Sequence, residues 1–280
     1  MRPGRRKWSP FLVQAALVAW AAVVLTPLAW MASASLMRPG EASEFPPPFF
    51  PSRPTLEHYR DLFTRLSLGR AAVNSLIISI GATLAVLLLN SMAGYAFAKL
   101  RFRGRDRVFA FLMAALVIPA PVAMLPLFLM LRSVGLVNTY VGAALPATAG
   151  ILGIFLVRQF ARGIPDDLLD AARLEGAGEL RIYWSIVLPM LRPVLATLAI
   201  ITFLGTWNEF VWPLVALTDE SRYTLPVALA ALVGEHSADV ELMMAGAVLT
   251  VLPVLALFLA LQKQYIEGIT LRAASSPLVQ

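Results

Sequence analysis

The stretch from residue 162 to 189 carries the most distinctive chemistry of this chain. Pro165 suits the first turn of a helix, and the two aspartates that follow it suit the positive end of the helix dipole. Gly176 suits a left-handed C-terminal stop. We therefore predict a short helix from about Pro165 to Glu175. Acidic and apolar side chains on one short helix are chemistry for docking against another protein.

The side chains of this predicted helix are spaced to share a face. Leu168, Leu169, Ala172 and Glu175 are within reach of one face, and Ala171 and Ala172 lack bulk, so another backbone can approach them closely. Displayed in the cytoplasm, such a helix is a docking element. The alternative is a plain connecting loop with no partner.

A second group of polar residues, Trp207, Asn208 and Glu209, lies inside an apolar stretch. A charge at the bilayer centre costs about 2.5 to 3.5 kcal/mol on insertion scales, so Glu209 must face protein or water. Two interpretations stay open: these residues line a substrate path, or they form hydrogen bonds between helices.

Other kinds of site are not encoded. The chain has no cysteine, and His58 and His236 have no metal-ligand spacing, so we interpret both as ordinary loop histidines. Gly176 and Gly178 follow no predicted strand and no Gly-x-x-x-x-Gly-Lys-Ser/Thr string occurs, which excludes a phosphate loop. The net charge of +6 does not indicate nucleic-acid binding, because the basic residues flank apolar blocks.

These residues must be positioned by helices that cross a membrane. Hydrophobic residues make up 59% of the chain and charged residues 14%, and the apolar residues form long blocks. About 20 residues cross the hydrocarbon core as a helix. The first block follows a basic start but is too long for a cleaved signal peptide, so we expect a retained anchor. Six blocks qualify as spans: Phe11–Met37, Ala71–Ala98, Val108–Leu131, Thr139–Phe160, Val194–Leu217 and Leu242–Gln262.

The distribution of lysine and arginine predicts the orientation. Sixteen of the 23 fall on one side of the predicted spans, which by the positive-inside rule puts both termini and the 162–189 stretch in the cytoplasm. The cluster from Lys99 to Arg107 needs no role beyond setting this topology, although binding of anionic lipid is an alternative.

Prolines shape two segments of the chain. The external segment Arg38 to Leu68 contains a run of prolines that favours extended backbone, followed by an amphipathic helix predicted over Thr55 to Leu68. In the third span, Pro119, Pro121 and Pro126 predict a kink, either as a hinge or as ordinary packing distortion.

The 162–189 stretch also resembles a known family. It is similar to the EAA loop of inner-membrane permeases of binding-protein-dependent ABC importers. The matching positions are Asp170-Ala171-Ala172, then Gly176 after three residues, Ile186 after nine more, and Leu188-Pro189 after one more. The family usually has glutamate where this chain has Asp170. Further similar segments indicate the sugar-importer branch, related to the smaller permease of the maltose system: Asn74-Ser75, Ala96 to Arg105, Leu125 to Phe128, Gly135 to Thr139 and Trp207 to Phe210.

The resemblance implies a fold and a mechanism. It implies an all-α integral membrane protein with six transmembrane helices in the type I ABC importer fold. Residues 1–69 would form the tail, first span and external segment, 70–265 the transmembrane core, and 266–280 a cytoplasmic tail that diverges from the family after Thr270. ATPase closure would drive alternating access through the cytoplasmic helix. The implied ATPase-coupling residues are Asp170, Ala171, Ala172, Leu174, Glu175 and Gly176, and the substrate path would involve Trp207, Asn208 and Glu209.

The resemblance also implies partners and excludes catalysis by this chain. The partners would be two ABC ATPase subunits that hold ATP and magnesium, a second permease subunit in a heterodimer, and an extracytoplasmic solute-binding protein, all at a bacterial inner membrane. The chain would bind no cofactor, would not be an enzyme, and would move a sugar or related polar solute. An ion-gradient-driven secondary transporter and a membrane-embedded enzyme are the alternatives; no inverted repeat supports the first, and Glu209 alone is too little for the second.

Overall fold

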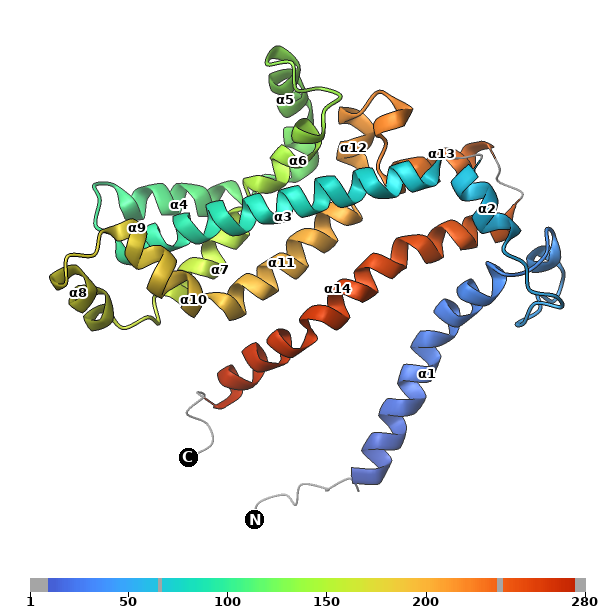
Figure 1. The fold of residues 1–280 in the computed structure, drawn as a ribbon, viewed down its shortest axis with the longest axis horizontal. Coiled ribbons are helices and arrows are strands. Elements are labelled where there is room, and N and C mark those ends of the chain that lie inside the picture. Colours follow the sequence, from blue (N-terminus) through green and yellow to red (C-terminus); the bar gives the residue numbers. More distant parts are fainter. Residues whose placement is uncertain (1–9, 65–66, 236–238, 275–280) are drawn as a thin grey trace. The chain divides into compact units, whose positions relative to one another are not determined.

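The computed structural model describes residues 10–64, 67–235 and 239–274, and every regular element in these ranges is helical (Figure 1). The chain divides into two compact units, Met1–Ser67 with Leu229–Leu252, and Leu68–Ala228 with Pro253–Gln280. Each unit is described by itself. The predicted division at residues 69 and 265 stays a prediction.

The first unit is built around the end of a long apolar helix. It contains α1 (Pro10–Ala34), a 3-10 turn (Glu41–Ser43), α2 (Glu57–Thr64) and the beginning of α14 (Val240–Ala274). After α1, Ala34, Met37 and Ala42 are buried together against Val240 and Met244. The basic residues predicted to precede the first span lie outside the described residues.

The proline-rich segment of this unit contains no helix over residues 45–51, as predicted. Side chains near the end of α1 hold it: the indole of Trp30 donates to the Pro48 carbonyl at 3.1 Å. The carboxylate of Glu41 accepts hydrogen bonds from the backbone N–H groups of Arg38 and Ser52, at 2.9 and 2.6 Å. These bonds lower the pKa of Glu41 below its usual value, because they favour the charged carboxylate.

The interpretation of His58 as a loop histidine is wrong. His58 lies in α2 and is buried, with Nε2 3.0 Å from the Met37 carbonyl oxygen and Nδ1 3.9 Å from Asp239. The amphipathic pattern did predict the helix, which packs Leu62 and His58 inward. His236 lies outside the described residues. Within the described part of the chain, no group of three histidine, aspartate or glutamate side chains is placed to hold a metal ion.

The second unit is organised around α3 (Leu68–Lys99), which packs along α6 (Tyr140–Thr148), α7 (Ile151–Ala161) and α11 (Arg192–Trp207) (Figure 1). Gly94 lets α3 and α7 approach closely, since a Cβ there would lie 2.5 Å from Val157 Cγ1. The remaining elements of this unit are α4 (Arg105–Ala115), α5 (Ala120–Ser133), α8 (Asp166–Leu174), α9 (Glu179–Ile182), a short π-helix (Tyr183–Val187), α10 (Leu188–Met190), α12 (Val211–Ala216), a 3-10 turn (Glu220–Arg222), the start of α13 (Leu225–Glu235) and the end of α14 from Pro253.

Among the described residues, three helices are long and apolar enough to cross a membrane by themselves: Phe11–Ala34, Leu68–Lys99 and Val240–Ala260. Three bent helix pairs also qualify by length and composition, so the described chain has up to six candidate spans. The bends lie at 106° between α4 and α5, 46° between α6 and α7, and 78° between Glu179–Met190 and α11. The prolines of the third predicted span do mark a break, because Pro119 caps α5.

The fifth span was predicted wrongly as one helix over Val194–Leu217. Helix α11 ends at Trp207 and α12 begins at Val211. Pro213 supplies the reason: in a continuous helix it would leave the carbonyl of Glu209 without a donor and its ring would clash with that carbonyl. The bent pair of helices that is long and apolar enough to cross a membrane in this region runs instead from Glu179 to Trp207.

Candidate functional site

Helix α8 forms because its sequence encodes both of its ends. Pro165 is the N-terminal cap, and Asp166 and Asp167 lie in the first turn, where the helix dipole favours negative charge. Gly176 has a φ of +83°, which confirms the predicted left-handed stop. The N–H of Gly176 donates to the Arg173 carbonyl and that of Ala177 to the Ala172 carbonyl, both at 3.0 Å. This bonding is a Schellman motif, which satisfies the last carbonyls of the helix.

The two sides of α8 have different surroundings. Leu169 is 1% exposed and belongs to the hydrophobic core of the second unit, and Ala172 is half-buried against that core. Leu168 and Leu174 are 43% and 90% exposed, and Glu175 is also exposed. The predicted face is therefore wrong in part, because Leu169 and Ala172 point inward while Leu168 and Glu175 remain outside.

The predicted coupling residues remain largely accessible in this chain. Ala171 and Gly176 are exposed, as are Asp170, Leu174 and Glu175, whereas Ala172 is half-buried. A Cβ added at Gly176 would meet nothing within 4 Å, so its surroundings are open. The exposed side of α8 thus presents a large apolar side chain, small residues and carboxylates, with nothing in the described chain covering them.

The beginning of α8 is held by the last residue of α3. The side-chain ammonium of Lys99 donates to the Ile164 carbonyl at 2.6 Å, to Asp166 Oδ1 at 2.7 Å and to the Arg162 carbonyl at 3.4 Å. The Lys99 side chain is only 7% exposed. Its hydrogen bond and its charge hold the pKa of Asp166 below the usual value, because both favour the ionised carboxylate.

The end of α8 is held by a relay of polar side chains. Tyr95 Oη donates to Glu179 Oε2 at 2.7 Å, and Glu179 Oε1 accepts from Arg173 Nε at 2.8 Å. Arg173 Nη1 then donates to Asp170 Oδ1 at 2.6 Å. The hydrogen bonds to Glu179 and Asp170 raise the pKa of Arg173, so this guanidinium is a permanent cation.

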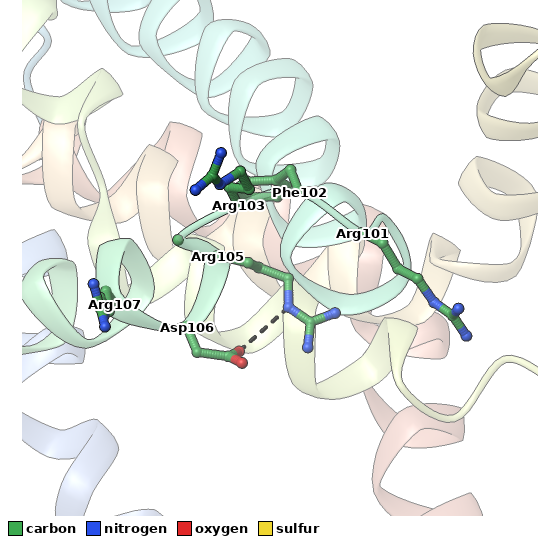
Figure 2. Close-up of a pocket in the computed structure, with 7 residues that line it drawn as sticks. Arg101, Phe102, Arg103, Arg105, Asp106 and Arg107 are labelled. Carbon is green, nitrogen blue, oxygen red and sulfur yellow. Dashed lines mark hydrogen bonds and ion pairs between the residues drawn. The ribbon is translucent and has the colours of Figure 1, made fainter.

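Residues 101–107, which cover the loop after α3 and the first turn of α4, line an open pocket of about 640 Å³. Figure 2 shows Arg105 directed at Asp106, with Nε 3.3 Å from Oδ1, while the guanidinium groups of Arg101, Arg103 and Arg107 point in different directions. They do not converge on one point in the pocket. The choice between a topology signal and a lipid contact stays open for this loop.

The predicted substrate-path residues lie at the break between α11 and α12. Trp207 is 1% exposed and stacks on Phe203, with ring centroids 5.8 Å apart. Asn208 and Glu209 are exposed, and Glu209 Oε1 accepts the N–H groups of Val211 and Trp212 at 3.1 and 3.2 Å. Glu209 therefore caps α12, a role that does not require its charge.

Sequence reasoning missed the residues that hold α8. No role is predicted for Tyr95 or Glu179, and Lys99 is predicted only to set the topology as part of a basic cluster, within a segment that resembles the family. Tyr95 and Lys99 are four residues apart and so share one side of α3, a spacing visible in the sequence. Nothing in the sequence shows that this side of α3 faces the loop around α8.

Comparisons with known proteins identify the family of this chain. Residues 90–270 match the family described as "Binding-protein-dependent transport system inner membrane component". The chain belongs to this family. It is 38% identical to the arabinooligosaccharides transport system permease protein AraQ of Halalkalibacterium halodurans, over 95% of this chain and 98% of the relative. It is 33% identical to the diacetylchitobiose uptake system permease protein NgcG of Streptomyces coelicolor, over 89% of this chain and 84% of the relative.

A solved structure shares the fold. The crystal structure of a bacterial ABC transporter involved in the import of the acidic polysaccharide alginate contains a chain that superposes with a TM-score of 0.79 at 25% identity, covering 94% of this chain and 99% of that one. The protein is thus a permease subunit of an ABC importer and an inner membrane component. It is a translocation subunit rather than an enzyme, and ATP hydrolysis belongs to a separate subunit.

Proposed function

We propose that this permease imports an oligosaccharide or a related polar solute and that α8 couples it to the ATPase. The observation that carries the coupling role is the exposed side of α8, on which Leu174 is 90% exposed at the end of a helix held at both ends. Docking that covered Leu174 would stabilise the complex by about 1.5 to 3 kcal/mol, the value of burying a leucine side chain.

The exposed residues fit a docking partner in type as well as in position. Ala171 and Gly176 allow close approach of another backbone, while Asp170 and Glu175 supply charge at the rim. We propose that two ABC ATPase subunits, which bind ATP and magnesium, dock at α8 and at the equivalent helix of a second permease subunit. This chain itself binds no cofactor in the proposal.

The remaining parts of the transport system follow from the family. A binding-protein-dependent system requires an extracytoplasmic solute-binding protein, and we propose a bacterial inner membrane with six spans and both termini in the cytoplasm. The relatives named for arabinooligosaccharides and diacetylchitobiose support a carbohydrate as the solute. Within the chain, the exposed Asn208 and Glu209 are the residues we assign to the solute path, with Trp207 packed behind them.

The coupling role is tested by a substitution that places a charge on the exposed side of α8. In proteoliposomes containing the complete importer, Leu174→Glu is expected to lower solute uptake at least tenfold, because a charge would be buried against the ATPase. The matched control is Leu56→Glu, which alters another exposed leucine, 68% accessible, in the predicted external segment. A Leu174→Cys variant should form a disulfide cross-link with a cysteine in the ATPase.

Three results would each contradict the proposal. Normal uptake by Leu174→Glu at normal membrane levels would show that α8 does not couple, and uptake driven by an ion gradient without any ATPase would establish a secondary carrier. Labelling of Leu174→Cys only from outside the cell would reverse the proposed topology.

A further inference from the structure

One turn of α3 holds both ends of α8. Tyr95 and Lys99 are four residues apart at the end of α3, so their side chains leave the helix on the same side. Lys99 holds the segment that enters α8, and Tyr95 holds the segment that leaves it through Glu179. Both residues belong to the same compact unit as α8.

At the start of α8, all three N–H donors of the Lys99 ammonium have an acceptor. An ammonium group has three N–H donors, and Lys99 has three acceptors within reach, two backbone carbonyls and the Asp166 carboxylate. The side chain is almost entirely buried, whereas that of Asp166 is 75% exposed. The lysine is therefore a fixed point to which the more accessible start of α8 is attached.

At the end of α8, a chain of hydrogen bonds connects Tyr95 to Asp170, one of the predicted coupling residues. The Tyr95 hydroxyl binds Glu179, the Glu179 carboxylate binds Arg173, and Arg173 binds Asp170 in α8 itself. Tyr95 is 3% exposed and its ring lies 6.0 Å from that of Tyr183, so the hydroxyl is held in place by the core. Charge-assisted hydrogen bonds of this kind are stronger than neutral ones.

We propose that Tyr95 and Lys99 are positioning residues that make α8 and α3 move as one rigid body. The inference rests on the proposed coupling role of α8 and names the part of the fold that receives the motion. Without the two contacts, α8 would remain attached by Leu169 and Ala172, which pack on the core, and by flanking segments that contain glycines, where the backbone has more conformational freedom. With them, a displacement of α8 is passed to α3 and so to α7 and α11, which pack along it.

The proposal predicts a loss of coupling rather than a loss of docking. Tyr95→Phe removes only the hydroxyl and keeps the buried ring, and Lys99→Met keeps the length of the side chain without its charge. We expect Tyr95→Phe, which loses one hydrogen bond to a carboxylate, to lower the number of solute molecules transported per ATP hydrolysed about tenfold. Lys99→Met, which loses three hydrogen bonds, should lower it at least as much, and the double variant should lower it further. ATP hydrolysis and the cross-link from Leu174→Cys to the ATPase should persist.

The matched control is Tyr183→Phe. Tyr183 is equally buried, and its hydroxyl lies 2.6 Å from Ser91 Oγ, so this change also removes a buried hydrogen bond to α3, but one that does not involve α8. We expect its transport per ATP to stay normal. A purely structural role for Tyr95 would lower membrane levels, hydrolysis and uptake together and leave their ratio unchanged.

The outcomes separate the two proposals. An unchanged ratio in the Tyr95→Phe, Lys99→Met double variant with the cross-link present would overturn the inference and leave the coupling role of α8 standing. Absence of the cross-link when no contact residue is altered would overturn the coupling role and the inference with it. If Lys99→Met fails to insert, Tyr95→Phe alone decides, because it deletes a single oxygen atom.

Discussion

Replacement of Gly176 by alanine tests how the end of α8 is built. Gly176 has a φ of +83°, and a Cβ there would meet nothing within 4 Å, so the cost of alanine is entirely conformational. A left-handed backbone costs an L-residue about 1 to 2 kcal/mol. The Schellman motif at the end of α8 should therefore become about 5 to 30 times less populated, relative to conformations in which its hydrogen bonds are broken.

Hydrogen exchange in the intact importer measures this change directly. The Ala177 N–H donates to the Ala172 carbonyl at 3.0 Å only when the motif is closed, so its exchange should accelerate about 5- to 30-fold in Gly176→Ala. Gly176→Asn should lie between the two, because asparagine tolerates the left-handed region. Uptake should fall in the same order, since the predicted docking residues lie next to the motif.

The control is the neighbouring glycine. Gly178 has φ −72° and ψ 158°, a conformation open to any residue, and a Cβ there also meets nothing within 4 Å. Gly178→Ala should leave exchange at Ala177 unchanged or slow it slightly. Equal acceleration in both alanine variants, or none in Gly176→Ala, would refute the conformational argument.

Three further predictions concern the packing, the pH dependence and the break after α11. Gly94→Ala should cost about 1 to 3 kcal/mol through overpacking against α7 and lower the melting temperature of the purified permease, whereas Gly81→Ala, with nothing within 4 Å of the added Cβ, should not. The Lys99 hydrogen bond lowers the pKa of Asp166 from its ordinary 3.8, so the stabilisation from this ion pair is complete above pH 3.8 and is lost as the pH falls through the lowered pKa. Melting temperatures measured at decreasing pH should show this loss, and Asp166→Asn should make the melting temperature depend less on pH in this range. Glu209→Gln keeps the oxygen that caps α12, so we expect a normal melting temperature with reduced uptake, and normal uptake would remove the charge of this residue from the solute path.

Local signals predicted the elements of the fold well where the cause of the structure was itself local. The helix from Asp166 to Leu174 follows from a proline and two aspartates at one end and a glycine at the other. The long apolar blocks likewise predicted α1 and α3, because a helix satisfies its own backbone hydrogen bonds within one segment. The family resemblance was carried by the same stretch, and the comparisons confirm it.

Local sequence patterns gave wrong predictions where the structure depends on the packing of one segment against another. The spacing of Leu168, Leu169, Ala172 and Glu175 permits one face, but the core beneath α8 takes Leu169 and Ala172 and leaves the other two outside. The continuous fifth span was wrong because the apolar composition of Val194–Leu217 outweighed the effect of a single proline.

What the sequence by itself determined, then, is the class of molecule, the long apolar helices and the short helix α8, because hydropathy and helix caps act over neighbouring residues. Only the tertiary structure decided which side of α8 is free and that Tyr95 and Lys99 hold its ends. These contacts join residues 63 to 67 positions apart for Lys99 and 84 positions apart for Tyr95. Hydrogen bonds of that range exist only after α3 has packed beside α7 and α11, which no local pattern encodes.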